Sequence, residues 1–124
     1  RVLLPNILFE SSIRIEYDSL VEKIVEFISE NYQSAITIGD ICKRFHISKN
    51  VLYQNFRNEL DCTVNDYIVN FKIERAKEML AGTALPVCLI AEKCGFVTNT
   101  YFNRVFKKKS GITPSNYRSI NNIK

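Results

Sequence analysis

The feature that most constrains the fold is an internal repeat of about fifty residues. Apolar and small polar residues recur at fifty-residue intervals: Leu52 with Phe102, Phe56 with Phe106, Thr63 with Thr113, and Tyr67 with Tyr117. Further upstream the interval is forty-nine residues: Ile41 with Ile90, and Ile47 with Phe96. The one-residue difference lies between Phe96 and Phe102, where a loop can absorb an insertion that a helix cannot. The sequence therefore predicts two copies of one structural unit.

Each copy has the pattern of two short helices joined by a tight turn. The first helix of each copy is marked by apolar residues: Ile38, Ile41, Cys42 and Phe45, or Val87, Ile90, Ala91 and Cys94. A turn follows at residues 46–47 or 95–96, and then Ser48 or Thr98 caps the second helix. This arrangement predicts a helix-turn-helix in each copy. Because such a pair is too small to bury a core, each copy needs further helices around it.

Those further helices are also visible in the sequence. Residues 18–31 place apolar side chains on one face, and a last short helix begins at Thr113 with Pro114 in its first position. Residues 63–80 form the longest predicted helix, which Thr63 caps and which ends before a break at residues 81–83. This helix carries two apolar stripes: Val64, Tyr67, Ile68 and Phe71, then Val69, Ile73, Ala76 and Leu80. Two stripes on one helix predict packing against two bodies.

The predicted fold class is all-α, with about seven helices, because Gly and Pro number only four and three and alternating apolar runs are absent. We expect two helix-turn-helix subdomains, over residues 16–62 and 81–124, joined by a long linker helix over residues 63–80. Residues 1–15 are expected to be a linker or a tail from a missing companion domain. Since the first residue is Arg and not Met, we expect the chain to be a piece of a longer protein or a processed form.

Positive charge is concentrated in the second copy. The net charge of +4 divides into −2 for residues 1–62 (seven Lys and Arg against nine Asp and Glu) and +6 for residues 63–124 (ten against four). Residues 97–118 contain no acid, and five cations stand unopposed there: Arg104, Lys107, Lys108, Lys109 and Arg118. A merely solvated helix more usually mixes Glu and Lys at i,i+4 spacing. The asymmetry favours a polyanionic partner for the second copy.

The second helix of each copy presents a polar face. With Leu52 or Phe102 turned inward, helical geometry turns other residues outward: Asn50, Tyr53, Gln54 and Arg57, or Thr100, Asn103, Arg104 and Lys107. Such side chains can read base edges and phosphates. The linker helix would span roughly 27 Å at ~1.5 Å per residue, and successive major-groove faces are about 34 Å apart. One chain could therefore place two unlike helices in adjacent major grooves of a non-palindromic site.

Three segments resemble the AraC/XylS-type bacterial transcription regulators: RAKEML at 75–80, IAEKCGF at 90–96 and YFNRVFKKKSGITPSNYR at 101–118. The resemblance covers roughly residues 18–119. It implies a seven-helix domain, with two helix-turn-helix subdomains and a linker helix, that binds double-stranded DNA at promoter sites. It further implies transcription activation, often through contact with RNA polymerase, and a separate effector-binding, dimerisation or receiver domain.

The resemblance also assigns individual residues to the DNA. The first recognition helix would use Lys49, Asn50, Tyr53 and Gln54, with Arg57 near the backbone. The second would use Asn99, Thr100, Asn103 and Arg104, with Lys107 near phosphate. Further phosphate contacts are assigned to Ser48, Thr98 and Lys108. One departure is that Asp61 stands where the second copy has Gly111, the residue that suits a left-handed helix end. Together with the acidic first half, this leads us to expect the second subdomain to supply more of the phosphate affinity.

The cysteine pattern argues against a metal site and a disulfide framework. Cys42, Cys62, Cys88 and Cys94 form no C-x-x-C pair, and only one histidine is present. We expect no cofactor, and a reducing, cytoplasmic location in which Cys42, Cys88 and Cys94 act as small apolar side chains. No apolar run is long enough to span a bilayer, and residues 1–9 are a poor signal peptide because Pro5 interrupts them.

Two other function classes are less consistent with the sequence. Catalysis is not expected, because His46 lies in a turn and no nucleophile, carboxylate pair or phosphate loop is evident. Some alkyl-transfer proteins carry similar domains beside a reactive cysteine, and Cys94 near Lys93 is the thiol that a reagent can test. The other alternative is a helical protein-interaction module for an acidic partner, which salt dependence and sequence preference would distinguish from a DNA-binding domain.

Overall fold

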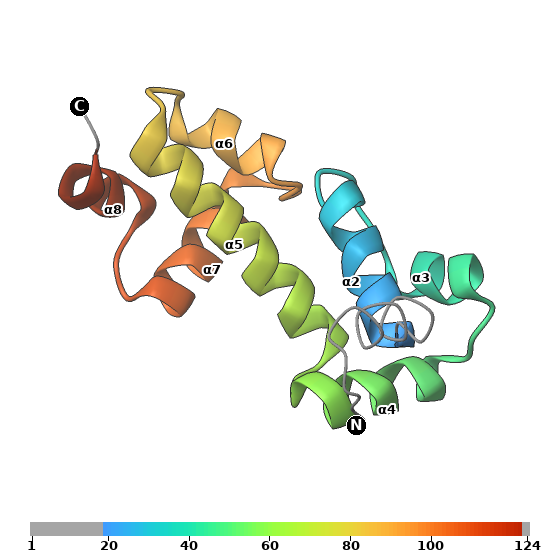
Figure 1. Ribbon diagram of the computed structural model, residues 1–124. Helices are drawn as coiled ribbons and strands as arrows, with labels where there is room; N and C mark the ends of the chain where they lie inside the picture. Colours follow the sequence, from blue (N-terminus) through green and yellow to red (C-terminus); the bar gives the residue numbers. More distant parts are fainter. Residues whose placement is uncertain (1–18, 123–124) are drawn as a thin grey trace, which may run out of the picture.

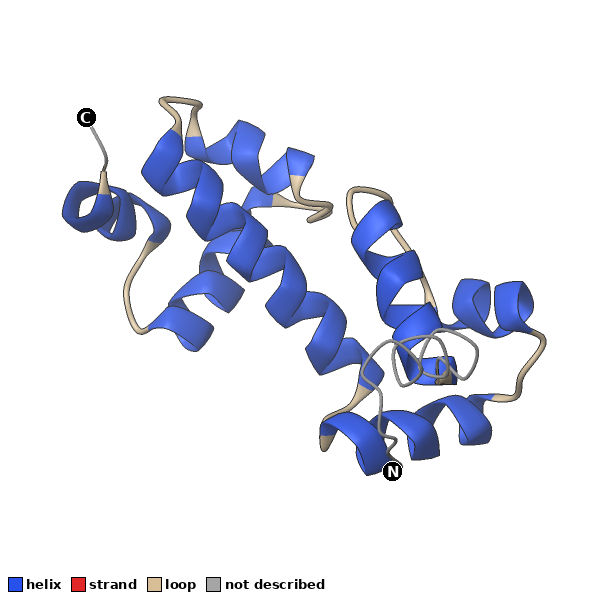
Figure 2. Cartoon of the chain, viewed as in Figure 1, coloured by secondary structure: helices blue, strands red, loops and turns tan. Residues whose placement is uncertain are grey.

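A computed structural model describes residues 19–122, which form seven α-helices and no strand (Figures 1 and 2). The helices are α2 (Leu20–Asn31), α3 (Ile38–Phe45), α4 (Lys49–Leu60), α5 (Val64–Gly82), α6 (Val87–Lys93), α7 (Asn99–Ser110) and α8 (Pro114–Asn121). The predicted all-α class and number of helices are confirmed. The predicted tail at residues 1–15 lies outside the described residues.

Hydroxyl side chains set where most of these helices begin. Six helices start after a Ser or Thr whose hydroxyl accepts an amide N–H three residues later: Ser19, Thr37, Ser48, Thr63, Thr98 and Thr113. Each such bond satisfies one of the N–H groups that a helix leaves without a partner at its start. At Ser19 and Thr37 an acidic residue three positions on bonds back to the cap, which completes a capping box. The local sequence therefore fixes the starts of both second helices, α4 and α7.

Two separate hydrophobic clusters bury the apolar residues, and α5 contributes to both. The first cluster joins α2, α3 and α4 to the start of α5 through Val64 and Ile68. The second joins α6, the following turn and α7 to the rest of α5 through Ile73, Ala76 and Leu80. In Figure 1, α5 runs diagonally between the two groups of helices. The prediction that this helix packs against two bodies is confirmed.

The end of α5 differs slightly from the predicted break. The helix continues through Gly82 and is closed by Thr83, whose N–H and hydroxyl both donate to the carbonyl of Met79 (2.9 and 2.7 Å). Arg118 of α8 reinforces this end, since its guanidinium donates to the carbonyls of Leu80 and Thr83 (3.1 and 3.2 Å). A cation at these otherwise unpaired carbonyls is favourable in charge and in hydrogen bonding. At 19 residues, α5 is about 28 Å long.

In both copies the second helix ends at a residue with a left-handed backbone conformation. Asp61 ends α4 with φ 55°, and Gly111 ends α7 with φ 86°. Each donates its N–H to the carbonyl four residues earlier, Arg57 or Lys107, at 3.0 and 2.8 Å. Asp61 therefore keeps the left-handed conformation and the closing hydrogen bond that Gly111 has in the second copy. Asp is among the few residues other than Gly that enter this region without large strain.

Cys94 belongs to the second cluster and is fully buried. Burial raises the pKa of its thiol to about 11, because desolvation outweighs the attraction of Arg75 and Lys72. The neighbouring Lys93 is exposed and is not a cause of this pKa shift. The thiol is therefore protonated near neutral pH and is not activated in the way that a reactive cysteine requires.

We expect the cysteines to differ sharply in their reactivity with Ellman's reagent at pH 8. Cys88 is exposed and should react first, whereas Cys94 should react only when urea unfolds the chain, because it is inaccessible and its folded-state pKa lies well above 8. Peptide mapping by mass spectrometry after timed labelling would assign each site. Labelling of Cys94 as fast as Cys88 in the folded chain would contradict this account of the core.

Candidate nucleic-acid interface

The two predicted recognition helices are anchored by equivalent buried residues. Leu52 and Phe56 fix α4 in the first cluster, and Phe102 and Phe106 fix α7 in the second. All four side chains are fully buried, so each helix has one inward face and a remaining outward face. In Figure 1, α7 lies below the diagonal α5, and α4 lies at its lower end, beneath α2 and α3. The repeat thus presents two unlike polar faces on one scaffold.

The structure leaves almost every predicted DNA-contacting side chain exposed. The exposed residues on or before α4 are Ser48, Lys49, Asn50, Tyr53, Gln54 and Arg57. Those on or before α7 are Thr98, Asn99, Thr100, Arg104, Lys107 and Lys108. Asn103 is the exception, since it is half-buried. The outward faces expected from helical geometry are therefore available to a partner.

Some of these polar groups are already bonded within the chain. The hydroxyls of Ser48 and Thr98 accept the N–H of Val51 and Tyr101 at 3.2 and 3.0 Å. A hydroxyl that accepts such a bond keeps its own proton to donate to a phosphate. The side-chain amide of Asn103 donates to the carbonyl of Asn99 at 2.9 Å, which leaves its second N–H and its oxygen for a base edge.

Tyr101 supports Arg104 on the outward side of α7. The Arg104 guanidinium carbon lies 5.3 Å from the centre of the Tyr101 ring, within the range of a cation–π contact. Tyr101 was not among the predicted site residues. Its i,i+3 spacing from an arginine is the sequence signal that could have identified it. The ring restricts the arginine to one side of the helix before any partner binds.

Three of the five cations in residues 97–118 have neither a carboxylate nor a backbone carbonyl as a side-chain partner in the described part of the chain: Arg104, Lys107 and Lys108. Lys109 reaches Asp66 of α5 at 3.9 Å, and Arg118 is bonded to the end of α5. The five cations are thus unopposed by acids within their own sequence window, but Lys109 and Arg118 have partners outside it. The absence of acids in the surrounding sequence gave no sign of Asp66 on another helix or of the backbone carbonyls of Leu80 and Thr83. Fewer cations than predicted are therefore free to bind a polyanion at α7, and these are Arg104, Lys107 and Lys108.

Val97 is a further exposed residue beside α7 that was not among the predicted site residues. Val97 directly precedes Thr98 and is 85% exposed, the most of any large apolar side chain among the described residues. Apolar side chains beside a recognition helix can contact the methyl group of thymine. An exposed valine next to a helix cap is the signal that could have drawn attention to it.

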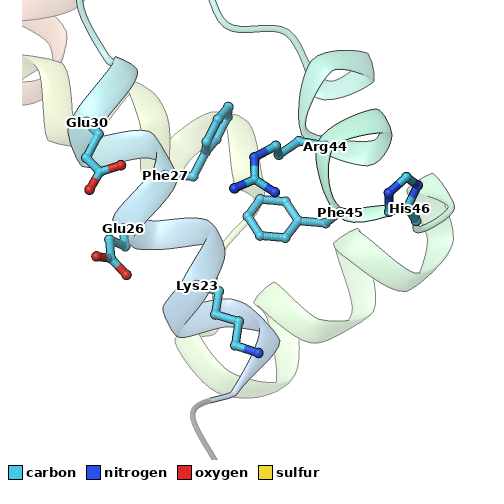
Figure 3. A pocket seen from close by; sticks show the side chains of 7 residues that line it. All are labelled: Lys23, Glu26, Phe27, Glu30, Arg44, Phe45 and His46. Atoms are coloured by element: carbon cyan, nitrogen blue, oxygen red, sulfur yellow. The ribbon is translucent and has the colours of Figure 1, made fainter. Parts of the chain in front are cut away.

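A groove between α2 and α3 is lined by no residue of the two recognition helices (Figure 3). Its lining residues are Lys23, Glu26, Phe27, Glu30, Arg44, Phe45 and His46. The Arg44 guanidinium lies over the rings of Phe45 and Phe27, at 5.1 and 5.8 Å from their centres. His46 occupies the left-handed turn after α3 and is exposed, with φ 57°. Because the lining mixes both signs of charge, this groove does not extend the positive surface.

Residues 19–122 contain no group of three or more His, Cys, Asp or Glu side chains placed to hold a metal ion. None of the helices in this range is both long and apolar enough to cross a membrane.

Comparison with known proteins agrees with this geometry. A family described as a helix-turn-helix domain matches residues 41–120. The Escherichia coli regulator YijO is 38% identical over 100 residues, covering 81% of this chain and 35% of that protein. The activator RhaR of Salmonella dublin is 30% identical over 105 residues, covering 85% of this chain and 37% of that protein. The chain thus spans little more than a third of the length of these two relatives.

A solved structure with the same arrangement is the C-terminal domain of AraT, a response regulator from Geobacillus stearothermophilus. It matches with a TM-score of 0.81 and 28% sequence identity, over 84% of this chain and 87% of that one. The family match covers more than half of the chain, and the neighbour shares its fold over most of both chains. The chain therefore belongs to the AraC-type family of helix-turn-helix transcription regulators.

Proposed function

We propose that this chain inserts α4 and α7 into successive major grooves of one duplex and reads an asymmetric promoter site. The observation that carries the proposal is the pair of exposed polar faces, each anchored by two buried apolar residues to a cluster that contains part of α5. Both recognition helices pack against α5, which is about 28 Å long, and the proposal requires their faces to meet major grooves ~34 Å apart. Since the two faces differ in sequence, the two half-sites should differ as well.

In this proposal, base reading and phosphate binding are divided among the exposed residues. Residues near the helix starts reach base edges: Lys49, Asn50, Tyr53 and Gln54 on α4, and Asn99, Thr100, Asn103 and Arg104 on α7. Arginine can bond two acceptors of guanine at once, and asparagine can do the same with adenine. The phosphate contacts are assigned to Ser48, Arg57, Thr98, Lys107 and Lys108. The unpaired cations of α7 support a larger electrostatic share for the second subdomain.

The role of the whole protein is a wider part of the proposal. The matched relatives are about three times the length of the shared region, so we infer that an effector-binding, dimerisation or receiver domain accompanies this one. The name of RhaR as an activator supports promoter activation, with RNA polymerase as a second partner. Promoter binding would place the protein in the bacterial cytoplasm, and no catalytic step is required of it.

The test of the proposal is binding to a duplex selected from a random DNA pool, followed by fluorescence anisotropy across a salt range. We expect the association constant to fall about 100-fold between 50 and 200 mM salt, if roughly four phosphates are contacted. The selected duplex should also be preferred over an unrelated duplex at every salt concentration. A chain that ignores all duplexes at low salt, yet binds an acidic polypeptide, would instead support the interaction-module alternative.

Arg104→Ala should cost roughly 1–3 kcal/mol of binding free energy and relax the sequence preference at one base pair. The reason is that Arg104 is exposed and held over Tyr101 at the outward side of α7. The measurement is anisotropy against a panel of duplexes that each carry one substituted base pair. Equal weakening for every duplex would mean that Arg104 contacts phosphate and that its assignment to a base is wrong.

Lys108→Ala is the matched charge control for the same panel. It removes one unpaired cation from the same helix, so it should weaken all duplexes alike and lower the slope of log affinity against log salt by at most about one. Sequence preference should remain that of the parent chain. A selective loss at one base pair would show that the outward face of α7 is assigned incorrectly.

A further inference from the structure

The two halves of the molecule touch each other beside the shared helix. The end of α2 meets the turn after α6, where Gly95 has φ 87°. A Cβ atom added to Gly95 would lie only 2.2 Å from the carbonyl oxygen of Tyr32. Figure 1 shows this turn beside the end of α2. The two backbones are therefore in direct contact, at a distance that only glycine permits.

The side chain of Lys72, on α5, also contacts this turn. Its ammonium group donates to the carbonyl of Gly95 at 3.0 Å and lies 5.7 Å from the centre of the Phe96 ring. Burial lowers the pKa of Lys72, as expected for a lysine taken partly out of water. Few surface lysines are held in this way, since most keep the ammonium group in solvent. Lys72 therefore ties the middle of α5 to the turn of the second helix-turn-helix.

Two aromatic residues, Tyr32 and Phe71, also belong to this contact between the halves. The Tyr32 ring meets the Phe71 ring edge-on, with 5.2 Å between their centres. Tyr32 follows α2 of the first half, yet it packs against the second cluster. Phe71 packs against the first cluster, and Ile73, two residues later, belongs to the second. The contact is thus placed at the point where α5 passes from one core to the other.

We propose that Lys72 is a positioning residue that fixes the rotation of the second helix-turn-helix relative to the first. Packed helices lie roughly 8–10 Å apart axis to axis. A rotation of about 20° about α5 would therefore move α7 by roughly 3 Å, close to the ~3.4 Å rise of one base pair. By holding Gly95 against Tyr32, Lys72 sets the number of base pairs between the two elements that the chain reads. This inference rests on the proposed two-groove binding.

The first test needs no DNA. Residual dipolar couplings of backbone amides report the orientation of each helix, and in the parent chain a single alignment tensor should fit α2 to α4 and α6 to α8 together. Lys72→Met keeps most of the side-chain stem and removes the hydrogen bond, so it should require two tensors of different magnitude. If one tensor of parent magnitude still fits Lys72→Met, the inference is overturned.

Lys77→Met is the matched control. Lys77 is also a half-buried lysine of α5, but its ammonium group pairs with Glu74 of the same helix at 3.3 Å. The substitution removes the same charge without touching the contact between the halves, so one tensor should still fit. A loss of the single tensor in both variants would overturn a specific role for Lys72. Should Lys72→Met not fold, Tyr32→Leu, which removes the ring contact with Phe71, takes its place with the same expectations.

The second test measures tolerance to spacing. With the selected duplex, inserting one base pair between the two elements should weaken the parent chain and Lys77→Met at least about 10-fold, and Lys72→Met by less than about 3-fold. An equal penalty in all three chains would overturn the positioning role. If the parent chain binds no two-element duplex, the proposed function fails, while the dipolar couplings still decide whether Lys72 fixes the orientation.

Discussion

The structure depends on α5 being shared by two hydrophobic cores. Val64 and Ile68 bury themselves with α2, α3 and α4, whereas Ile73, Ala76 and Leu80 bury themselves with α6 and α7. Neither small unit could enclose much apolar surface alone, because surface-to-volume scaling works against such short segments. By sharing one helix, each unit gains a wall for its core and a fixed attachment to the other. The same sharing places two recognition helices on one rigid element.

Much of this architecture could be predicted because it is encoded locally. The fifty-residue repeat, the hydroxyl caps and the two stripes of α5 each depend on spacing within a short segment. The roles of individual polar groups were harder to predict. Arg118 looked like a cation available to DNA, yet it bonds the carbonyls of Leu80 and Thr83. A partner that is a backbone carbonyl, 38 residues away in the case of Leu80, leaves no mark in the composition of its surroundings.

In the candidate site, too, the features that depend on local spacing could be predicted and those that depend on distant contacts could not. The outward faces of α4 and α7 followed from helical geometry once the buried residues were chosen. Tyr101 and Val97 were missed, because aromatic and aliphatic residues are normally assigned to a core. The contact of Tyr32 with Gly95 could not have been found from sequence, since it joins backbone atoms of different halves. The glycine there looks like an ordinary turn residue, and its close approach to another backbone is apparent only in three dimensions.

In the proposed function, one chain contacts one face of the duplex at two places that α5 holds a fixed distance apart. Hydroxyl-radical footprinting of the monomeric chain on its selected site tests this most directly. The account predicts two protected segments of unlike sequence, on the same face and about 10 base pairs apart. A single protected segment, even on the tightest site that can be selected, would contradict it.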